Sequence, residues 1–181
     1  MYTTKASRFN ADSRLRYEHQ LSHYSLMFLS IYIILISSAP TFDVIDWVSS
    51  NVCAFFSFIL SVFVLGVAAF EAGNNRLEKA FKLHDNALKI NALLRTLNDK
   101  SDATKAADEY SQILASCDHN HSEIDYYKAR ALNKHLDEET SLWEKILWRL
   151  HGLRHYGFYW LAITAPAVVI ITLFVLHFYS S

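Results

Sequence analysis

The chain has 181 residues, of which 52% are apolar, and its 17 Lys and Arg nearly balance its 18 Asp and Glu. A formal net charge of -1 favours neither an acidic tail nor a basic surface, so we expect no direct binding of nucleic acid. With four glycines the chain cannot build a glycine-rich phosphate loop, and its two cysteines lie in unlike surroundings that predict no disulfide.

The first segment, residues 1–20, is polar and rich in basic side chains. Its apolar residues fall loosely on one helical face, which comprises Ala6, Phe9, Leu15 and Tyr17. This pattern predicts an amphipathic helix that lies on the cytoplasmic surface of a membrane.

Two apolar runs follow, at about residues 21–39 and 47–70. The second run, WVSSNVCAFFSFILSVFVLGVAAF, contains no Asp, Glu, Lys or Arg. At about 1.5 Å rise per residue it spans about 36 Å as a helix, more than the roughly 30 Å of a hydrocarbon core. Pro40 ends the first run and the link TFDVID is short, so residues 21–70 are predicted to form a transmembrane hairpin.

The second apolar run carries small side chains at spacings of four, three and four residues, namely Ser50, Ala54, Ser57 and Ser61. This spacing places them on one face of a helix. Such a face allows close helix packing, or it lines a water-filled pore when several subunits contribute it. The sequence leaves both roles open.

Residues 71–155 are polar and are predicted to be helical throughout. One apolar stripe contains Ala80, Leu83, Ala87, Ile90, Leu94 and Leu97, and continues the second crossing with Gly73 as the candidate joint. After a turn at 98–101, a second stripe contains Ala103, Ala106, Tyr110, Ile113 and Cys117. We expect the two helices to pack on each other or on neighbouring subunits.

The segment Asp118–Asp125 is the best candidate for a chemical site, because it holds His119 and His121 between its acids. These residues span a turn and no third strong ligand completes a metal site. Ser122 followed by Asp125 instead predicts an N-cap for a helix that runs to about Lys134. We therefore expect no catalytic residue, no metal site, no cofactor and no enzymatic activity.

A last cytoplasmic helix near residues 138–153 leads into a third apolar run, residues 156–179. Pro166 lies inside this run, and the hydroxyls of Thr164 and Thr172 are candidates to satisfy the carbonyl that a proline frees. The predicted fold is an all-α membrane protein with a two-helix transmembrane hairpin, a cytosolic helical region (71–155) and an additional C-terminal transmembrane helix.

The basic residues predict the orientation. All 17 Lys and Arg lie in residues 1–20 or 71–155, whereas the link between the first two crossings holds only acidic charges. Positive residues stay on the cytoplasmic side of a membrane. The N-terminus and residues 71–155 are therefore expected inside the cell, and the C-terminus outside.

Three stretches of the chain are distinctive: KASRFNADSRLRYEHQLSHYS, EAGNNRLEKAFKLHDNALKINALLRTL and DEYSQILASCDHNHSEIDYYKAR. They resemble the SLATT family, the SMODS and SLOG-associating two-transmembrane effector domains. The third is the most distinctive, and its motif residues are Tyr110, Ile113, Leu114, Asn120, His121, Ser122, Asp125 and Tyr126. The likeness covers about residues 1–135, and the third crossing resembles a branch of the family linked to reverse transcriptases.

The resemblance implies an oligomeric, pore-forming effector of a prokaryotic anti-phage conflict system. Such an effector permeabilises the inner (plasma) membrane, in abortive infection, when a sensor protein or a nucleotide second messenger acts on its cytosolic region. Its expected partners are the lipid bilayer and further copies of the chain. The alternatives are a non-conducting membrane scaffold that recruits a cytosolic enzyme, and a membrane enzyme that uses the Asp118–Asp125 turn.

Overall fold

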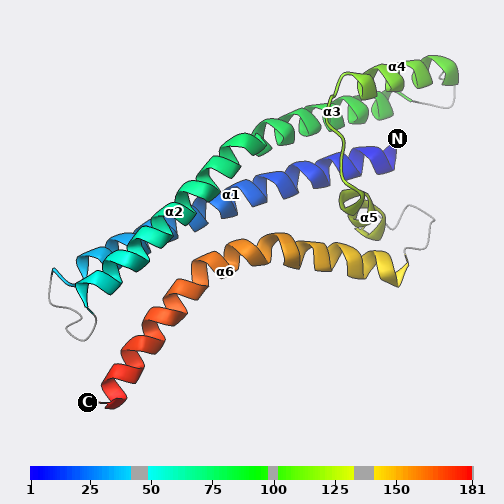
Figure 1. Cartoon of the computed structure of the whole chain (residues 1–181). Coiled ribbons are helices and arrows are strands. Elements are labelled where there is room, and N and C mark those ends of the chain that lie inside the picture. The colour runs from blue at the N-terminus through cyan, green and yellow to red at the C-terminus, as the bar shows by residue number, and fades with distance from the viewer. Residues whose placement is uncertain (42–48, 98–101, 133–140, 181) are drawn as a thin grey trace. The chain divides into compact units, whose positions relative to one another are not determined.

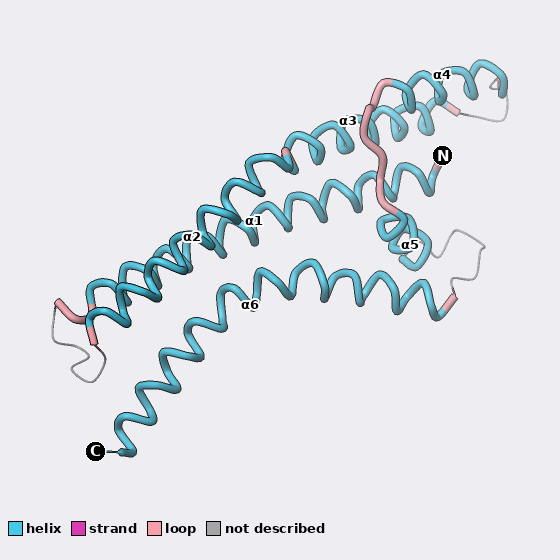
Figure 2. Tube along the Cα trace, viewed as in Figure 1, coloured by secondary structure: helices cyan, strands magenta, loops and turns pink. Residues whose placement is uncertain are grey.

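A computed structural model describes residues 1–41, 49–97, 102–132 and 141–180 of the chain. Its elements are the helices α1 (Tyr2–Ser38), α2 (Ser50–Asn74), α3 (Arg76–Thr96), α4 (Ala103–Ala115), α5 (Glu123–Leu132) and α6 (Leu142–Ser180) (Figures 1 and 2). The described residues contain no strand, which confirms the all-α class. Most of the predicted link between the first two crossings, the turn at 98–101, the end of the helix predicted to reach Lys134 and the start of the one predicted near 138 lie outside the described residues.

The chain divides into two compact units. The polar unit comprises Met1–His19 and Asn75–Arg154, and the membrane unit comprises Gln20–Asn74 and His155–Ser181. The segments predicted as a surface helix and a first crossing form one uninterrupted helix, α1, because no Gly or Pro precedes Pro40. The last cytoplasmic helix and the third crossing are likewise one helix, α6.

Within the described ranges, three helical stretches are long and apolar enough to cross a membrane: Tyr2–Ser38, Ser50–Thr96 and Leu142–Thr172. Much of the apolar surface of the membrane unit is exposed, and Phe58, Leu65 and Ile171 are each more than 60% accessible. Large exposed apolar areas are rare on water-soluble monomers but suit contact with lipid. The structure therefore agrees with the predicted three crossings.

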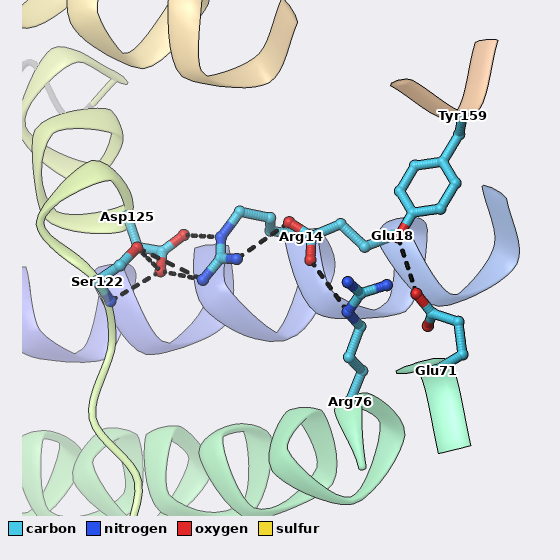
Figure 3. Close-up of polar contacts among 7 residues, drawn as sticks. All are labelled: Arg14, Glu18, Glu71, Arg76, Ser122, Asp125 and Tyr159. Carbon is cyan, nitrogen blue, oxygen red and sulfur yellow. Dashed lines mark hydrogen bonds and ion pairs between the residues drawn. The ribbon is translucent and has the colours of Figure 1, made fainter. Parts of the chain in front are cut away.

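Polar contacts join the three helices of the membrane unit. The hydroxyl of Tyr32 on α1 donates to the carbonyl of Ile163 on α6 over 2.9 Å. Ser25 on α1 donates to the carbonyl of Leu21, 2.8 Å away, and lies 3.3 Å from that of Tyr159 on α6. The Tyr159 hydroxyl donates in turn to the carboxylate of Glu71 on α2, at 2.9 Å (Figure 3). The third crossing is thus hydrogen-bonded to both helices of the hairpin.

The two threonines near Pro166 do not satisfy the carbonyl that the proline frees. Pro166 has no N–H to donate to Ala162, four residues earlier. Thr164 donates to the carbonyl of Trp160 and Thr172 to that of Val168, each at 2.8 Å. Each threonine bonds within its own preceding turn, so that prediction is wrong.

The joint between α2 and α3 lies at Asn75, whereas the sequence suggested Gly73. Asn75 has φ 45° and ψ 37°, the left-handed region, and is the N-cap residue of α3. Asparagine tolerates this conformation better than most residues because its short polar side chain can hydrogen-bond locally. Gly73 continues α2 as an ordinary helical residue, so its conformational freedom is not used.

Within the polar unit, α3 packs on α4, the first of the two arrangements expected for the stripes (Figure 1). The buried side of α3 contains Ala80, Leu83, Asn86, Ala87, Ile90 and Leu93. Leu93 replaces the predicted Leu94, and Asn86 adds a polar group. In α4, the side chain of Asp102 accepts the backbone N–H groups of Thr104 and Lys105, which fixes the start of the helix.

The part of α1 in the polar unit buries a polar side. Its buried residues are Ser7, Arg8, Ala11, Asp12 and Glu18, whereas Tyr17 of the predicted apolar face is 40% exposed. Charged side chains are rarely buried unless they are paired. The pairing partners of this side therefore decide how the polar unit holds together.

The joint gives a matched pair of substitutions. Asn75→Ala should lower the free energy of unfolding by about 1 kcal/mol, because alanine is strained at a positive φ. Gly73→Ala should raise it by about 0.5 kcal/mol, because a Cβ there meets nothing within 4 Å and alanine is the better helix former. Thermal unfolding of the purified chain in detergent measures both changes. Shifts of the same sign would contradict a joint at Asn75.

Candidate functional site

The predicted small-residue face of α2 divides into a buried part and an exposed part. Ser57 is only 8% exposed, whereas Ser50, Ala54 and Ser61 are exposed. Cys53, also buried, precedes Ser57 by one helical turn, so the covered side of α2 is rotated away from the centre of the small-residue face. Ser57 therefore packs inside the membrane unit, and the other three residues remain accessible.

The motif residues Ser122 and Asp125 form half of the cap that the sequence predicts. The Asp125 carboxylate accepts the backbone N–H of Ser122 at 3.0 Å and its hydroxyl at 2.8 Å, and α5 begins at the next residue, Glu123. The acid thus satisfies a backbone donor at the helix start, as predicted. Among the described residues no backbone N–H donates to the Ser122 hydroxyl, so the part of the cap that the serine was expected to supply is not formed.

Asp125 also binds α1, through Arg14 (Figure 3). The Nε and Nη2 atoms of Arg14 donate to the two oxygens of Asp125, each over 2.9 Å. The amide of Asn10 donates to the Asp125 carbonyl at 3.2 Å. Asp125 is 1% exposed, so this fork-to-fork ion pair is shielded from water, where such pairs interact most strongly.

Arg14 has a second acidic partner, which extends the network to α3. Its Nη1 lies 3.1 Å from the carboxylate of Glu18, which in turn lies 3.6 Å from Nε of Arg76 (Figure 3). Burial alone would lower the pKa of Arg14, but hydrogen bonds and charges from Asp125 and Glu18 outweigh it and raise the pKa. Arg14 therefore stays charged and ties α1 to α5.

Four other motif residues line a pocket of about 430 Å³ in the polar unit: Tyr110, Leu114, Asn120 and His121. Tyr110 on α4 donates its hydroxyl to Thr4 of α1, at 2.9 Å, and the backbone N–H of His121 donates to the Asn120 side chain. Burial lowers the pKa of His121, and the charge of Arg8 lowers it further against the opposing charge of Asp125. His121 is therefore a neutral hydrogen-bonding group at neutral pH.

The motif residue Tyr126 lies on α5 beside Tyr127, and the guanidinium of Arg130 lies over its ring at 5.7 Å. Arg130 forms an ion pair with Glu144 of α6 at 3.0 Å. The motif thus separates into a capping and pairing group, a pocket group and an aromatic contact. In the described part of the chain, no three His, Cys, Asp or Glu side chains gather as metal ligands.

The sequence analysis missed the residues on α1 and α3 that complete these groups. Arg8, Arg14 and Glu18 were assigned to a membrane-surface helix, and Asn86 was not singled out. The available signal was the helical spacing of Ser7, Ala11, Arg14 and Glu18, which places them on one side of a helix. That signal does not distinguish a solvated polar face from a buried one.

Comparison with known proteins gives one family-level result. A family model described as "SMODS and SLOG-associating 2TM effector domain family 5" matches residues 1–178. The match extends beyond the 1–135 expected from the motifs and includes the third crossing. Neither curated proteins nor solved structures give a match.

Removing the charge of Asp125 should destabilise the polar unit. Asp125→Asn leaves the buried Arg14 with Glu18 as its one acidic partner, and breaking such a buried ion pair costs about 3 kcal/mol. The matched control is Asp118→Asn, which breaks the exposed contact to Lys82 (3.3 Å) and should have a much smaller effect. Chemical unfolding followed by circular dichroism measures both. If both variants lost the same free energy of unfolding, the buried Arg14–Asp125 pair would stabilise the unit no more than the exposed contact does.

Proposed function

The chain belongs to the SMODS and SLOG-associating 2TM effector domain family 5, and from that premise we propose that it is an oligomeric, pore-forming membrane effector of a prokaryotic anti-phage conflict system. In this proposal it permeabilises the inner membrane when a sensor protein or a nucleotide signal acts on its polar unit. The observation that carries the proposal is the family match over residues 1–178, which contains all three apolar helices.

The membrane unit supports a role inside the bilayer. Its apolar side chains face outward, and within α2 the first acidic or basic residue is Glu71, close to the end of the helix. A bilayer-facing surface of this kind needs no protein partner to cover it. A charge-free central stretch argues against a strongly charge-selective filter or a proton relay.

The exposed small residues of α2 are our candidates for the pore lining. Ser50, Ala54 and Ser61 lie beside the covered side of the helix, where a neighbouring subunit could approach closely. The Ser61 hydroxyl donates to the Ser57 carbonyl at 2.7 Å, which leaves its oxygen able to accept a hydrogen bond from water. Copies of this face arranged around an axis would form a weakly polar channel.

The topology is also part of the proposal. The basic residues place the N-terminus and residues 71–155 in the cytoplasm and the C-terminus outside. The polar unit would then face the cytosol, where a partner or a small-molecule signal reaches it.

The second candidate function is a non-conducting scaffold. The polar unit is a helical module with an exposed surface that could recruit a cytosolic enzyme, while the membrane unit acts only as an anchor. The exposed Trp143 and Leu153 of α6, each at least 70% accessible, favour this reading, because apolar side chains outside the bilayer often mark a protein contact.

Conductance across a planar bilayer tests the pore. Ala54→Trp should reduce or abolish discrete channel openings, because a bulky ring on the exposed small-residue face would fill the lumen or separate the subunits. The matched control is Ile59→Trp, on the opposite side of α2, where 46% exposure predicts contact with lipid and normal conductance. Ser57 is unsuitable for this test because a tryptophan there would clash within one chain.

The other results of this experiment discriminate between the proposals. Openings that are equally insensitive to both substitutions would move the lining to another helix. A complete lack of conductance, with assembled protein present in the bilayer, would favour the scaffold.

Labelling of an introduced cysteine tests the topology. Ser111→Cys in a Cys117→Ser background places an exposed thiol on α4, and the remaining native Cys53 is buried in the membrane unit. A polyethylene-glycol maleimide, too large for a narrow pore, should label this thiol in inside-out vesicles and not in intact spheroplasts. The Cys117→Ser chain alone should stay unlabelled in both. Labelling from the outside of spheroplasts would refute the orientation.

A further inference from the structure

Arg8 is a buried cation without a described counter-ion. It lies on α1 in the polar unit and is 4% exposed. Among the described residues, no Asp or Glu forms an ion pair with it; its Nη1 donates to the Asn86 side chain, and its buried Nε has no hydrogen-bond partner. A charge buried without an opposite charge costs several kcal/mol.

Arg14, about two turns further along α1, is an arginine of the same unit whose charge is balanced by acidic partners. Arg14 has Asp125 and Glu18 as acidic partners, at 2.9 and 3.1 Å. Arg8 has an amide oxygen in the corresponding role, although an amide carries no charge. Among the described residues, no acid therefore balances the charge of Arg8.

Arg8 lines the pocket of about 430 Å³ together with Thr4, Tyr110, Leu114, Asn120 and His121. Several neutral hydrogen-bonding groups surround it there. The Nδ1 atom of His121 is buried and unpartnered in the described structure, and the amide of Asn120 also lines the pocket. The hydroxyl of Thr4 accepts from Tyr110 and keeps its own proton to donate. One charged fork surrounded by neutral donors is a suitable environment for an oxyanion.

The acid at the rim of the pocket does not serve Arg8. Asp118 lies 3.3 Å from Nζ of Lys82 and is exposed to solvent. A hydrogen bond from its own backbone N–H and the contact with Lys82 lower the pKa of Asp118. Because the charge of Asp118 is balanced by Lys82, Asp118 does not neutralise the positive charge that Arg8 gives the pocket.

We propose that this pocket binds the phosphate group of a small phosphate ester, with Arg8 as the charged ligand-binding residue. The guanidinium fork matches two phosphate oxygens, while Tyr110 and Leu114 provide an apolar wall for the organic part. The volume is within the range of small-molecule sites. Binding of a phosphate ester does not depend on the proposed function of the chain. Only the idea that this ligand is the signal that activates the effector rests on the proposed function.

Calorimetric titration of the full chain in detergent tests this site. The probes are inorganic phosphate, AMP as a phosphate ester, and adenosine as the matched compound without the phosphate. We expect AMP to bind and adenosine not to bind. Arg8→Met should weaken AMP binding by at least about tenfold, because it removes a charged hydrogen-bond donor. The control Lys105→Met, an exposed cation on α4 outside the pocket, should bind as the original chain does.

A second pair of variants keeps the test decisive if Arg8→Met does not fold. Asn120→Ala and Thr4→Val remove neutral donors that line the pocket, and each should weaken AMP binding by a few fold. Failure of both phosphate and AMP to bind at millimolar concentration would overturn the proposal. Unchanged affinity in Arg8→Met, or in both of the neutral-donor variants, would overturn it as well.

The same preparations separate this inference from the pore. Bilayers that conduct while the chain binds neither phosphate nor AMP would refute the site and leave the pore intact. Phosphate or AMP binding that depends on Arg8, in a chain that never conducts, would support the site and refute the pore.

Discussion

The ion pair between Arg14 and Asp125 is the constraint on which the polar unit depends. It joins two residues separated by 111 positions in the chain, and both oxygens of the acid are engaged by the arginine. The same carboxylate caps α5 through Ser122. Loss of that one acid would therefore release a helix start and leave a buried guanidinium at the same time. A single side chain fixes where α5 begins and which helix it lies against.

The two units solve the burial of polar groups in different ways. In the membrane unit, hydroxyl groups donate across the helices, as Tyr32 does to the carbonyl of Ile163 and Tyr159 to the carboxylate of Glu71. In the polar unit the buried side of α1 is charged and relies on partners from α3 and α5. This division explains why one helix, α1, reads as polar in its first half and apolar in its second.

Much of the fold was predictable because membrane crossings and helix stripes are local patterns. The crossing in α2 is predicted by a long run without charged residues. The buried stripe from Ala80 to Ile90 is predicted by apolar residues at helical spacing. The Ser122–Asp125 cap is a four-residue signal. The pairing of Arg14 with Asp125 and the burial of Arg8 were not predictable, because they depend on residues about a hundred positions away. The joint at Asn75 was assigned to Gly73 because glycine is the commoner residue in such conformations.

The continuity of the helices has a mechanical consequence. The chain passes between the two units at three places, and at two of them, within α1 and within α6, the backbone is uninterrupted helix. A helix resists twisting, since rotating one end requires every hydrogen-bonded turn to follow. A rotation of the first turns of α1 is therefore resisted by the helix as far as its apolar half. At the third passage, the left-handed backbone of Asn75 interrupts the helix, and no continuous ladder of hydrogen bonds opposes twisting there.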